Sequence, residues 1–259
     1  MSVVRPKIVR TSSVIPDVDS PAFLAASGLV RLVHLPVVSS TMDVAHALAA
    51  EGTPAGTLIL ADRQEQGRGR AGKAWSSEEH AGIWCTLIER PLDAATLSVL
   101  SLRVGLALAA MLDPCVASPV RLKWPNDLFV GDGKLGGVLV EARWRGARIE
   151  WVGIGVGINR RLPSDHGAAG FLAASVHPTV SQEDLVARTA RALRGACEHV
   201  GPLTTDECAA WHARDVAIGR QLIAPVVGTA RGVAADGGLV VASENGILRT
   251  VHSGSLQFA

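Results

Sequence analysis

Short apolar runs alternate with amphipathic segments over most of the chain. Thr57–Ala61 and Ile83–Ile88 are continuous apolar runs of strand length, typical of buried strands. Three segments have apolar positions at helical spacing or an N-cap signal, and predict helices over about 42–51, 95–112 and 182–200. This pattern predicts a main domain that mixes strands and helices.

The next segment has the pattern of a bent hairpin. Pro125 is incompatible with a helix interior or a central strand, so Trp124–Asp127 is expected to be a bend between strand pieces. Asp132-Gly133 is a turn signal, and the strand returns as Lys134–Glu141. A hairpin of this length brings the polar residues of the bend within reach of Lys134. Glu141 is interpreted as a partner of Lys123 or a strand-end charge.

Ile149–Asn159 alternates strictly from Val152 onward. Its apolar residues share one face of the expected strand, and Gly153, Gly155 and Gly157 share the other. A glycine face leaves a bare backbone groove, either for a ligand or for a closely packed neighbour. The segment alone does not decide between these two.

From Arg220 the pattern changes to short strands separated by turn signals, after a short helix that Thr205 is expected to cap. We therefore expect a small β-barrel over residues 213–259, following a main domain over 29–212. Residues 160–180 are expected to form a polar loop. Residues 1–28, interrupted by Pro6, Pro16 and Pro21, are expected to form a weak N-terminal extension without a helix-turn-helix pair.

Composition narrows the class of protein. The chain has 259 residues, 48% hydrophobic and 19% charged, with a net charge of +1, which fits a soluble globular protein without wholesale nucleic-acid binding. The cysteines lack the spacing of a zinc site or a disulfide framework and fit a reducing compartment. No signal peptide or membrane span is visible. We expect a cytoplasmic protein that binds neither DNA nor membranes.

The stretch Gly67–Trp75, GRGRAGKAW, is cationic and rich in glycine, a composition suited to wrapping an anion. Its letters fit a dinucleotide fingerprint and, in part, a phosphate loop. Ala74 replaces the hydroxyl that a phosphate loop needs, and no helical pattern follows for either motif. A solvated basic loop without a ligand also remains open.

Further motifs favour another interpretation. Together, GRGRAGKAW, KWPNDL (Lys123–Leu128) and KLGGVLVE (Lys134–Glu141), preceded by Gln64, resemble the biotin protein ligase family. The resemblance runs from about residue 33 to the C-terminus. It implies an α+β fold, a mixed β-sheet flanked by helices, followed by a small C-terminal β-barrel.

The resemblance also implies a reaction. Such enzymes activate biotin with Mg²⁺ and ATP to biotinyl-5'-AMP and pyrophosphate. They then pass biotin to one lysine of the biotin carboxyl carrier protein or domain of a carboxylase. Joining a carboxylate to a triphosphate needs positive charge near both anions, which makes Arg70, Lys123 and Lys134 the expected catalytic residues.

The other roles follow by motif. Biotin contacts are implied for Ser40, Thr41, Gln64, Arg68, Gly69, Arg70, Lys134, Gly155 and Gly157. ATP contacts are implied for Trp75, Lys123, Asn126, Asp127 and Asn159, with Asp127 as a Mg²⁺ ligand.

The match has departures. Met42 stands where the family often has asparagine, and Ala71 and Lys73 stand at positions that are often arginine. The chain ends at Phe258-Ala259, without the late basic residue that some members use near ATP. Some members also carry an N-terminal winged-helix repressor domain. Only about thirty residues precede the matching region here, so we expect a ligase without a repressor function.

Two other functions are considered. A lipoate ligase shares the fold and the adenylate chemistry, but its usual run of glycines with a nearby histidine is absent. A biotin-binding regulator without turnover is disfavoured, because Lys123, Asn126, Asp127 and Lys134 serve the nucleotide and the reaction as well as binding. An exposed strand is compatible with a homodimer or with docking of the carrier.

Overall fold

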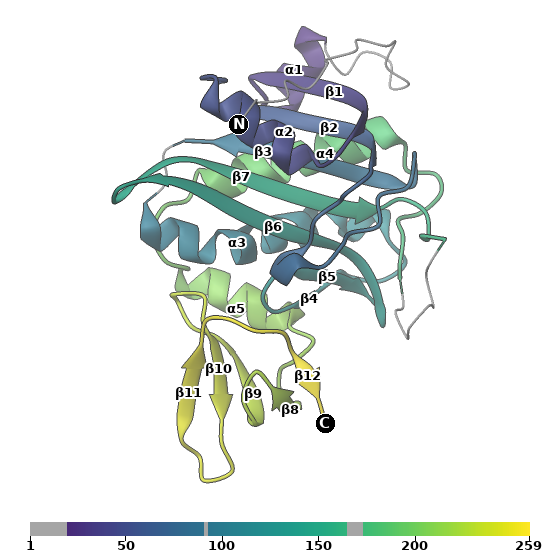
Figure 1. Cartoon of the computed structure of the whole chain (residues 1–259). Helices are drawn as coiled ribbons and strands as arrows, with labels where there is room; N and C mark the ends of the chain where they lie inside the picture. Colours follow the sequence, from purple (N-terminus) through teal and green to yellow (C-terminus); the bar gives the residue numbers. More distant parts are fainter. Residues whose placement is uncertain (1–19, 91–92, 165–172) are drawn as a thin grey trace.

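The computed structural model describes residues 20–90, 93–164 and 173–259 (Figure 1). The first part of the expected N-terminal extension, residues 1–19, and residues 165–172 of the expected polar loop lie outside this range.

A seven-stranded sheet with the order β1-β2-β3-β7-β6-β5-β4 forms the centre of the main domain. The strands are β1 (Arg31–Val38), β2 (Thr57–Gln64), β3 (Gly82–Glu89), β4 (Arg121–Lys123), β5 (Asp127–Val130), β6 (Gly133–Arg145) and β7 (Arg148–Asn159). β1 pairs with β2 in parallel, and the other neighbours pair antiparallel. The mixed sheet implied by the resemblance is confirmed, as is the bend between β4 and β5.

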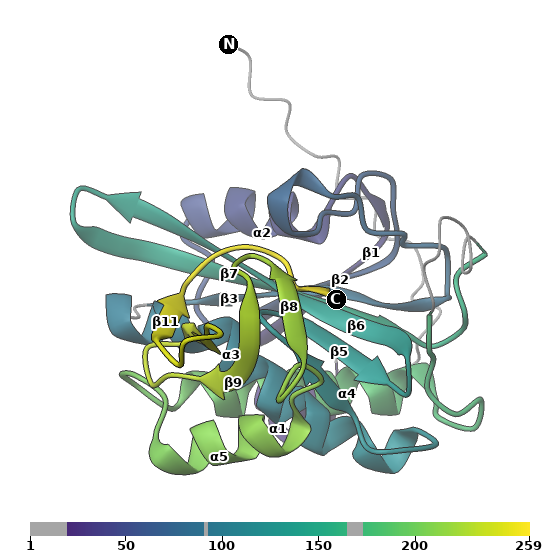
Figure 2. The same cartoon turned by 90° about the horizontal axis from the view of Figure 1, so that it is seen from below.

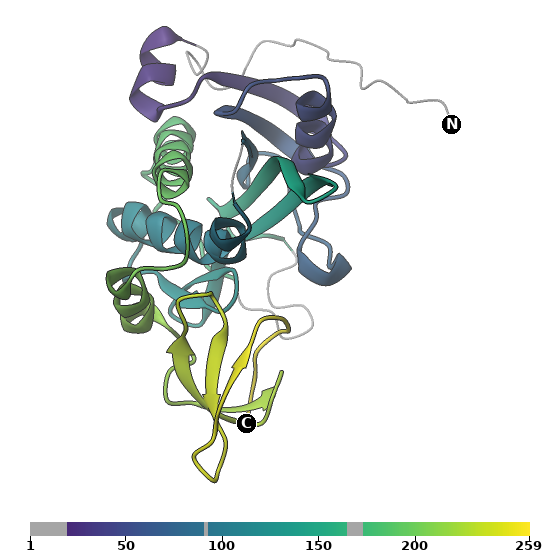
Figure 3. The same cartoon turned by 90° about the vertical axis from the view of Figure 1, so that its left-hand side faces the viewer.

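Helices cover both faces of this sheet. α2 (Thr41–Ala50) lies on one face, and α3 (Ala94–Leu112), α4 (Gln182–Cys197) and α5 (Thr205–Arg214) lie on the other side (Figures 2 and 3). Two single turns of 3₁₀ helix occur at Arg70–Gly72 and Asp113–Cys115. The helices predicted from apolar spacing are therefore confirmed, with ends that shift by up to three residues.

The period-two pattern of the strands separates two cores. Leu58 and Leu60 of β2 join the large core under α3 and α4, whereas Ile59 between them joins a small core under α2. On β7 the apolar positions from Val152 to Ile158 also enter the large core. The glycines of β7 therefore face the α2 side, as the strict alternation predicted.

One helix was not predicted. α1 (Pro21–Ser27) lies within the segment that we expected to be a weak extension, and it packs against α4. Pro21 begins this helix instead of interrupting it, because the first helical position needs no backbone N–H. Ser20 caps the start, and Phe23 is buried in the large core.

A second correction concerns α5. Its N-cap is Thr204 and not Thr205. The Thr204 side chain accepts a hydrogen bond from the backbone N–H of Glu207, and the Glu207 side chain accepts one from that of Thr204. This capping box leaves Thr205 as the first helical residue.

The C-terminal strands form a separate five-stranded sheet with the order β11-β10-β9-β8-β12 (Figure 1). They are β8 (Gln221–Ala224), β9 (Gly228–Val233), β10 (Leu239–Ala242), β11 (Leu248–Val251) and β12 (Gln257–Phe258). Among the described residues β11 and β12 are not paired with each other, so the barrel-like unit is open where closure was expected. β12 pairs only at Gln257 and Phe258, which is too short to bridge to β11.

Trp124 joins the two units. Its indole is buried, and Nε1 donates a hydrogen bond to the carbonyl oxygen of Gly237 at 3.0 Å. The KWPND bend therefore touches the C-terminal sheet on one side and the main sheet on the other.

α3, with the residues to Cys115, is long and apolar enough to cross a membrane by length and composition. Burial explains this apolarity, because α3 packs between the sheet and helices α4 and α5. Its one charged residue, Arg103, is only 3% exposed and forms a bidentate pair with Glu207 at 2.6 and 3.0 Å. The guanidinium also donates to backbone carbonyl groups between His199 and Pro202.

Replacing Arg103 by alanine should therefore strongly destabilise the protein. The change removes the partner of Glu207 and several backbone contacts, and we expect the free energy of unfolding to fall by about 3–5 kcal/mol. Urea denaturation at neutral pH measures this. The control is Arg188→Ala, which removes a partly exposed pair with Asp184 within α4 and should lose less than about 0.5 kcal/mol. Equal losses in the two variants would contradict the account.

The same pair predicts a pH dependence. The hydrogen bond from Arg103 lowers the pKa of the Glu207 carboxyl below its ordinary value, although burial opposes the shift. A lowered folded-state pKa contributes stability above the unfolded-state pKa and loses it as pH falls through the folded one. The stability difference between wild type and Arg103→Ala should therefore be full at pH 7 and shrink below about pH 4. A difference that stays constant down to pH 3 would contradict this.

Candidate functional site

A pocket of about 710 Å³ lies on the α2 side of the sheet, bounded by the start of α2, the loop after β2 and the β5–β6 hairpin. Every residue that the resemblance implied is among those that line it. These are Ser40, Thr41, Gln64, Arg68, Gly69, Arg70, Trp75, Lys123, Asn126, Asp127, Lys134, Gly155, Gly157 and Asn159. Ser255 adds one residue from the C-terminal unit.

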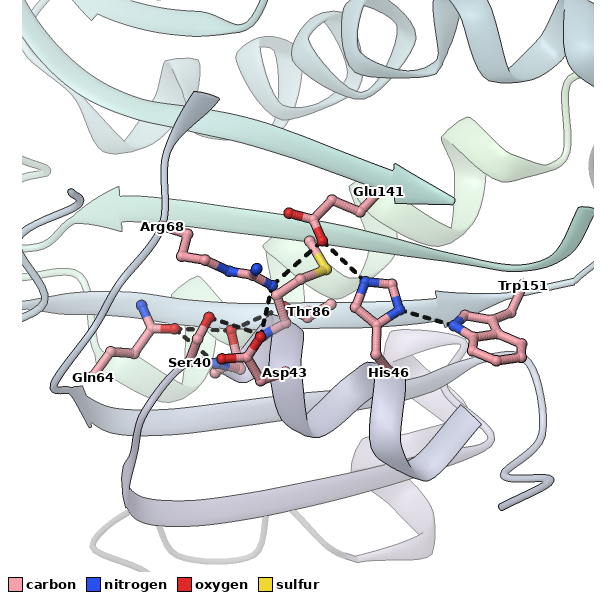
Figure 4. Close-up of polar contacts among 10 residues, drawn as sticks. Ser40, Asp43, His46, Gln64, Arg68, Thr86, Glu141 and Trp151 are labelled. Atoms are coloured by element: carbon pink, nitrogen blue, oxygen red, sulfur yellow. Dashed lines mark hydrogen bonds and ion pairs between the residues drawn. The ribbon is translucent and has the colours of Figure 1, made fainter. Parts of the chain in front are cut away.

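One corner of the pocket is a network of neutral polar groups (Figure 4). The backbone N–H of Thr41 donates to Gln64 Oε1 at 2.8 Å, and its hydroxyl lies 3.1 Å from the same oxygen. Thr86 Oγ1 lies 2.9 Å from Thr41 Oγ1, and Gln64 Nε2 donates to Ser77 Oγ at 2.8 Å. Such hydroxyl and amide groups suit a small neutral ligand with both donors and acceptors.

The loop Gly67–Trp75 folds back on itself beside this corner. The N–H of Trp75 donates to the carbonyl of Gly67 at 2.8 Å, and the N–H of Gly69 donates to that of Lys73 at 2.7 Å. Only glycine fits at position 67, because a Cβ there would lie 2.4 Å from the carbonyl oxygen of Trp75. A single 3₁₀ turn stands where a dinucleotide or phosphate loop needs an α-helix, so both of those alternatives fail.

Trp75 lies inside the pocket, on the glycine face of β7. A Cβ on Gly157 would meet its indole at 2.6 Å, and the ring centroid is 4.9 Å from Lys134 Nζ. The indole Nε1 is buried and has no hydrogen-bond partner among the described residues. Both alternatives for the glycine face therefore hold, because the face packs closely against a neighbour and also lines a pocket.

Met42 is the other close neighbour of the glycine face. Its Sδ and Cε would lie 2.6 and 3.0 Å from a Cβ on Gly153 and Gly155, respectively. Met42 is buried beneath the polar corner. The residue that departs from the family pattern therefore gives this end of the pocket an apolar floor.

The opposite end of the pocket is cationic. Lys134 Nζ pairs with Asp127 Oδ1 at 2.7 Å, which confirms that the hairpin brings the bend to Lys134. Burial lowers the pKa of the Lys123 ammonium group and outweighs Asp127, while Lys134, Arg220 and Lys73 add to the shift. Burial likewise lowers the pKa of the Arg70 guanidinium, which Asp127 opposes. A bound anion would relieve this unfavourable charge.

The C-terminal unit adds a cation near Lys123. The Phe258 ring contacts two positive groups, with its centroid 5.4 Å from Lys123 Nζ and 3.6 Å from the Arg220 guanidinium carbon. Arg220 thus approaches the same region as Lys123.

Two asparagines hold the walls of the cationic end. Asn126 Nδ2 donates to the carbonyl of Val138, and Asn159 Nδ2 donates to those of Lys134 and Ala174. No group of three His, Cys, Asp or Glu residues in the described part of the chain could hold a metal alone. Asp127 and Asp132 are the carboxylates that line the pocket, and oxygen ligands of this kind suit a hard cation such as Mg²⁺.

Glu141 differs from both interpretations of the sequence. It is neither a partner of Lys123 nor a free strand-end charge, because its Oε2 accepts from Arg68 Nη2 at 3.3 Å and contacts His46 Nε2 at 3.1 Å (Figure 4). Asp43 pairs with the same Arg68 nitrogen at 2.8 Å. The prediction failed because Glu141 points to the α2 side, whereas Lys123 lies beyond the β5–β6 hairpin.

Sequence analysis also missed Thr86. It is a polar residue within the apolar run of β3, and the pairing places it opposite Gly155. A lone polar residue at that register was an available signal. Asp43 and Ser77 carried no such signal, because acidic and hydroxyl residues are ordinary at a helix start and in a loop.

Comparison with known proteins now identifies the domain. Residues 34–159 match the biotin/lipoate A/B protein ligase family. This stretch is a domain of that family. The match includes the polar corner, the cationic loop, the β5–β6 hairpin and the glycine strand of the site.

Individual relatives agree. The chain is 38% identical over 136 residues to the bifunctional ligase/repressor BirA of Bacillus spizizenii, covering 52% of this chain and 42% of that one. It is 35% identical over 141 residues to the biotin--[acetyl-CoA-carboxylase] ligase of Mycobacterium tuberculosis, covering 52% and 51%. The alignments thus span about half the length of these curated relatives.

The fold agrees over nearly the whole chain. The biotin protein ligase of Aquifex aeolicus in complex with biotin and ATP superposes with a TM-score of 0.74 at 22% identity. The alignment covers 89% of this chain and 99% of that one. The C-terminal unit therefore belongs to the shared architecture.

Gly157, which lines the pocket, and Gly136, on the neighbouring strand β6 and outside the lining, should respond differently to a methyl group. In Gly157→Ala the new Cβ meets the Trp75 ring, which can move with its loop, so we expect a change in tryptophan fluorescence and little loss of stability. In Gly136→Ala the Cβ would lie 2.6 Å from the carbonyl oxygen of Gly157, which the sheet holds in place. That variant should lose about 1–3 kcal/mol. Thermal and urea unfolding of both variants test this, and the reverse order would contradict the placement of Trp75.

Proposed function

We propose that this protein is an ATP-dependent biotin protein ligase. One observation carries the proposal: all the residues implied by motif meet in a single pocket that is neutral and polar at one end and cationic at the other. Relatives that share the domain are named as biotin ligases, and a structural neighbour was solved with biotin and ATP. Localisation in the cytoplasm and action on a carboxylase's biotin carboxyl carrier protein are part of the proposal.

The proposed roles follow the two ends of the pocket. Ser40, Thr41 and Gln64, with Thr86, would bind the ureido ring of biotin, and Gly155 and Gly157 would flank its ring system. Lys134 would exchange Asp127 for the biotin carboxylate. Contacts with biotin are also proposed for Arg68 and Gly69.

The nucleotide would occupy the cationic end. Trp75 would stack on adenine, while Lys123, with Asn126, Asp127 and Asn159, would bind the nucleotide. Mg²⁺ held by Asp127 would neutralise phosphate charge.

The chemistry needs little from the protein beyond position and charge. A biotin carboxylate oxygen attacks the α-phosphorus of ATP, an O–P bond forms, and the bond to the β-phosphate breaks to release pyrophosphate. The carboxylate is already a nucleophile, so this step needs no general base. Arg70, Lys123 and Lys134 would stabilise the growing negative charge. A deprotonated carrier lysine then attacks the acyl carbon, and AMP leaves.

Pyrophosphate release from Mg-ATP, measured with biotin, lipoate or no acid, tests the proposal. Biotin-dependent release together with a biotinyl-adenylate in the mass spectrum is the expected result. Release with lipoate alone would assign the chain to the other branch of its family, and biotin binding without release would indicate a regulator. The proposal does not include a repressor role, and a sequence-specific, salt-resistant gel shift would add one.

Lys134→Ala should impair the first step. It leaves the biotin carboxylate without its ion pair, a charge-assisted contact worth roughly 1.5–3 kcal/mol, so biotin should bind about ten- to a hundredfold more weakly. Calorimetric titration and pyrophosphate release measure this. The control is Arg143→Ala, an exposed cation on the same strand, β6. Normal adenylate formation in Lys134→Ala would contradict the assigned role.

A further inference from the structure

A chain of hydrogen bonds leads from Trp151 on β7, through His46 on α2, to the cationic loop (Figure 4). Trp151 Nε1 on β7 donates to His46 Nδ1 on α2 at 2.9 Å. His46 Nε2 lies 3.1 Å from Glu141 Oε2 on β6, and the same oxygen accepts from Arg68 Nη2 at 3.3 Å. The hydrogen bonds thus join α2 and the cationic loop to the β6–β7 hairpin.

The donor and acceptor groups of the partners fix the direction of each hydrogen bond. An indole N–H only donates, so His46 Nδ1 must accept. The ring proton of the neutral imidazole is then on Nε2, where it donates to the Glu141 carboxylate. A ring with the proton on Nδ1 would place two donors against each other at Trp151. These hydrogen bonds therefore hold one tautomer of His46 and one orientation of the Glu141 carboxylate.

Trp151, at one end of this row of hydrogen bonds, is held by packing. Trp151 packs against the small core under α2, and the Arg90 guanidinium lies 5.7 Å from its ring centroid. Arg90 also donates to the carbonyl oxygen of Ala49, close to the end of α2. Trp151 is therefore held by contacts on two sides, and its indole N–H can hold the His46 imidazole in a fixed position.

The inner end of the chain holds Arg68 between two carboxylates. Asp43 pairs with Arg68 Nη2 at 2.8 Å from the α2 side, and Glu141 pairs with it from the β6 side. Two acids more than balance the charge of one guanidinium. Arg68 thus ties its loop to the sheet and to α2.

We infer that Trp151, His46 and Glu141 are positioning residues that hold Arg68, and through it the loop Gly67–Trp75, across the pocket. This inference deepens the proposed function and rests on it for its kinetic consequence: a held loop keeps biotin and its adenylate in the pocket. The contacts between the residues themselves do not depend on that function.

The first test requires no activity. Trypsin can cut the loop after Arg68, Arg70 and Lys73 when the loop opens. His46→Leu removes both hydrogen bonds of the imidazole and should raise the rate of cleavage in the loop by about three- to tenfold. His46→Gln keeps a donor and an acceptor and should remain near the wild-type rate. Arg145→Gln, an exposed change at the far end of β6, is the matched control. Equal rates for His46→Leu and wild type would overturn the inference.

The second test separates positioning from general damage. His46→Leu should raise KM for biotin by a similar factor while KM for ATP and kcat stay near wild type, and His46→Gln should restore KM. An unchanged or lower KM for biotin in His46→Leu would overturn the inference. If wild type shows no biotin-dependent release, the proposed function fails, and the proteolysis experiment still decides whether the chain holds the loop. If His46→Leu does not fold, Trp151→Phe, which removes the indole donor and keeps an aromatic ring against the small core, takes its place with the same expectations.

Discussion

The structure of the site depends on the backbone that the glycines of β7 leave uncovered. Apolar residues on the other face of the same strand enter the core under α3 and α4, and this packing holds β7 in place. Its glycine face can then be approached closely by Met42 from α2 and by Trp75 from the cationic loop. A side chain at Gly155 would displace Met42, and one at Gly157 would displace Trp75. One strand therefore serves as core on one face and as the floor of the pocket on the other.

The cations around this floor differ in whether a carboxylate pairs with them. Arg68 is compensated by Asp43 and Glu141, and Lys134 by Asp127, whereas burial lowers the pKa of both Lys123 and Arg70. Clustered cations with lowered pKa values are unfavourable until an anion arrives. Trp124 ties the KWPND bend beside these cations to the C-terminal unit. A bound anion would offset the cost of burying these two cations.

Much of this was predictable from the sequence. The alternation in Ile149–Asn159 gave the two faces of β7, and Pro125 with the following turn gave the hairpin that joins Asp127 to Lys134. The α1 helix was missed because Pro21 reads as a breaker unless Ser20 is recognised as its cap. The open form of the C-terminal sheet and the contacts of Glu141 depend on pairings between distant segments. No local pattern encodes them, since each partner is ordinary in its own surroundings.

The central claim is that the glycine floor under Trp75 is where biotin binds, with its carboxylate on Lys134. The most direct measurement is a crystal structure of the protein grown with biotin. The account predicts that the ring system lies against Gly155 and Gly157, that the Trp75 indole has left Gly157, and that Lys134 has exchanged Asp127 for the ligand carboxylate. Biotin bound elsewhere, with Trp75 still on Gly157 and the Lys134–Asp127 pair intact, would contradict it.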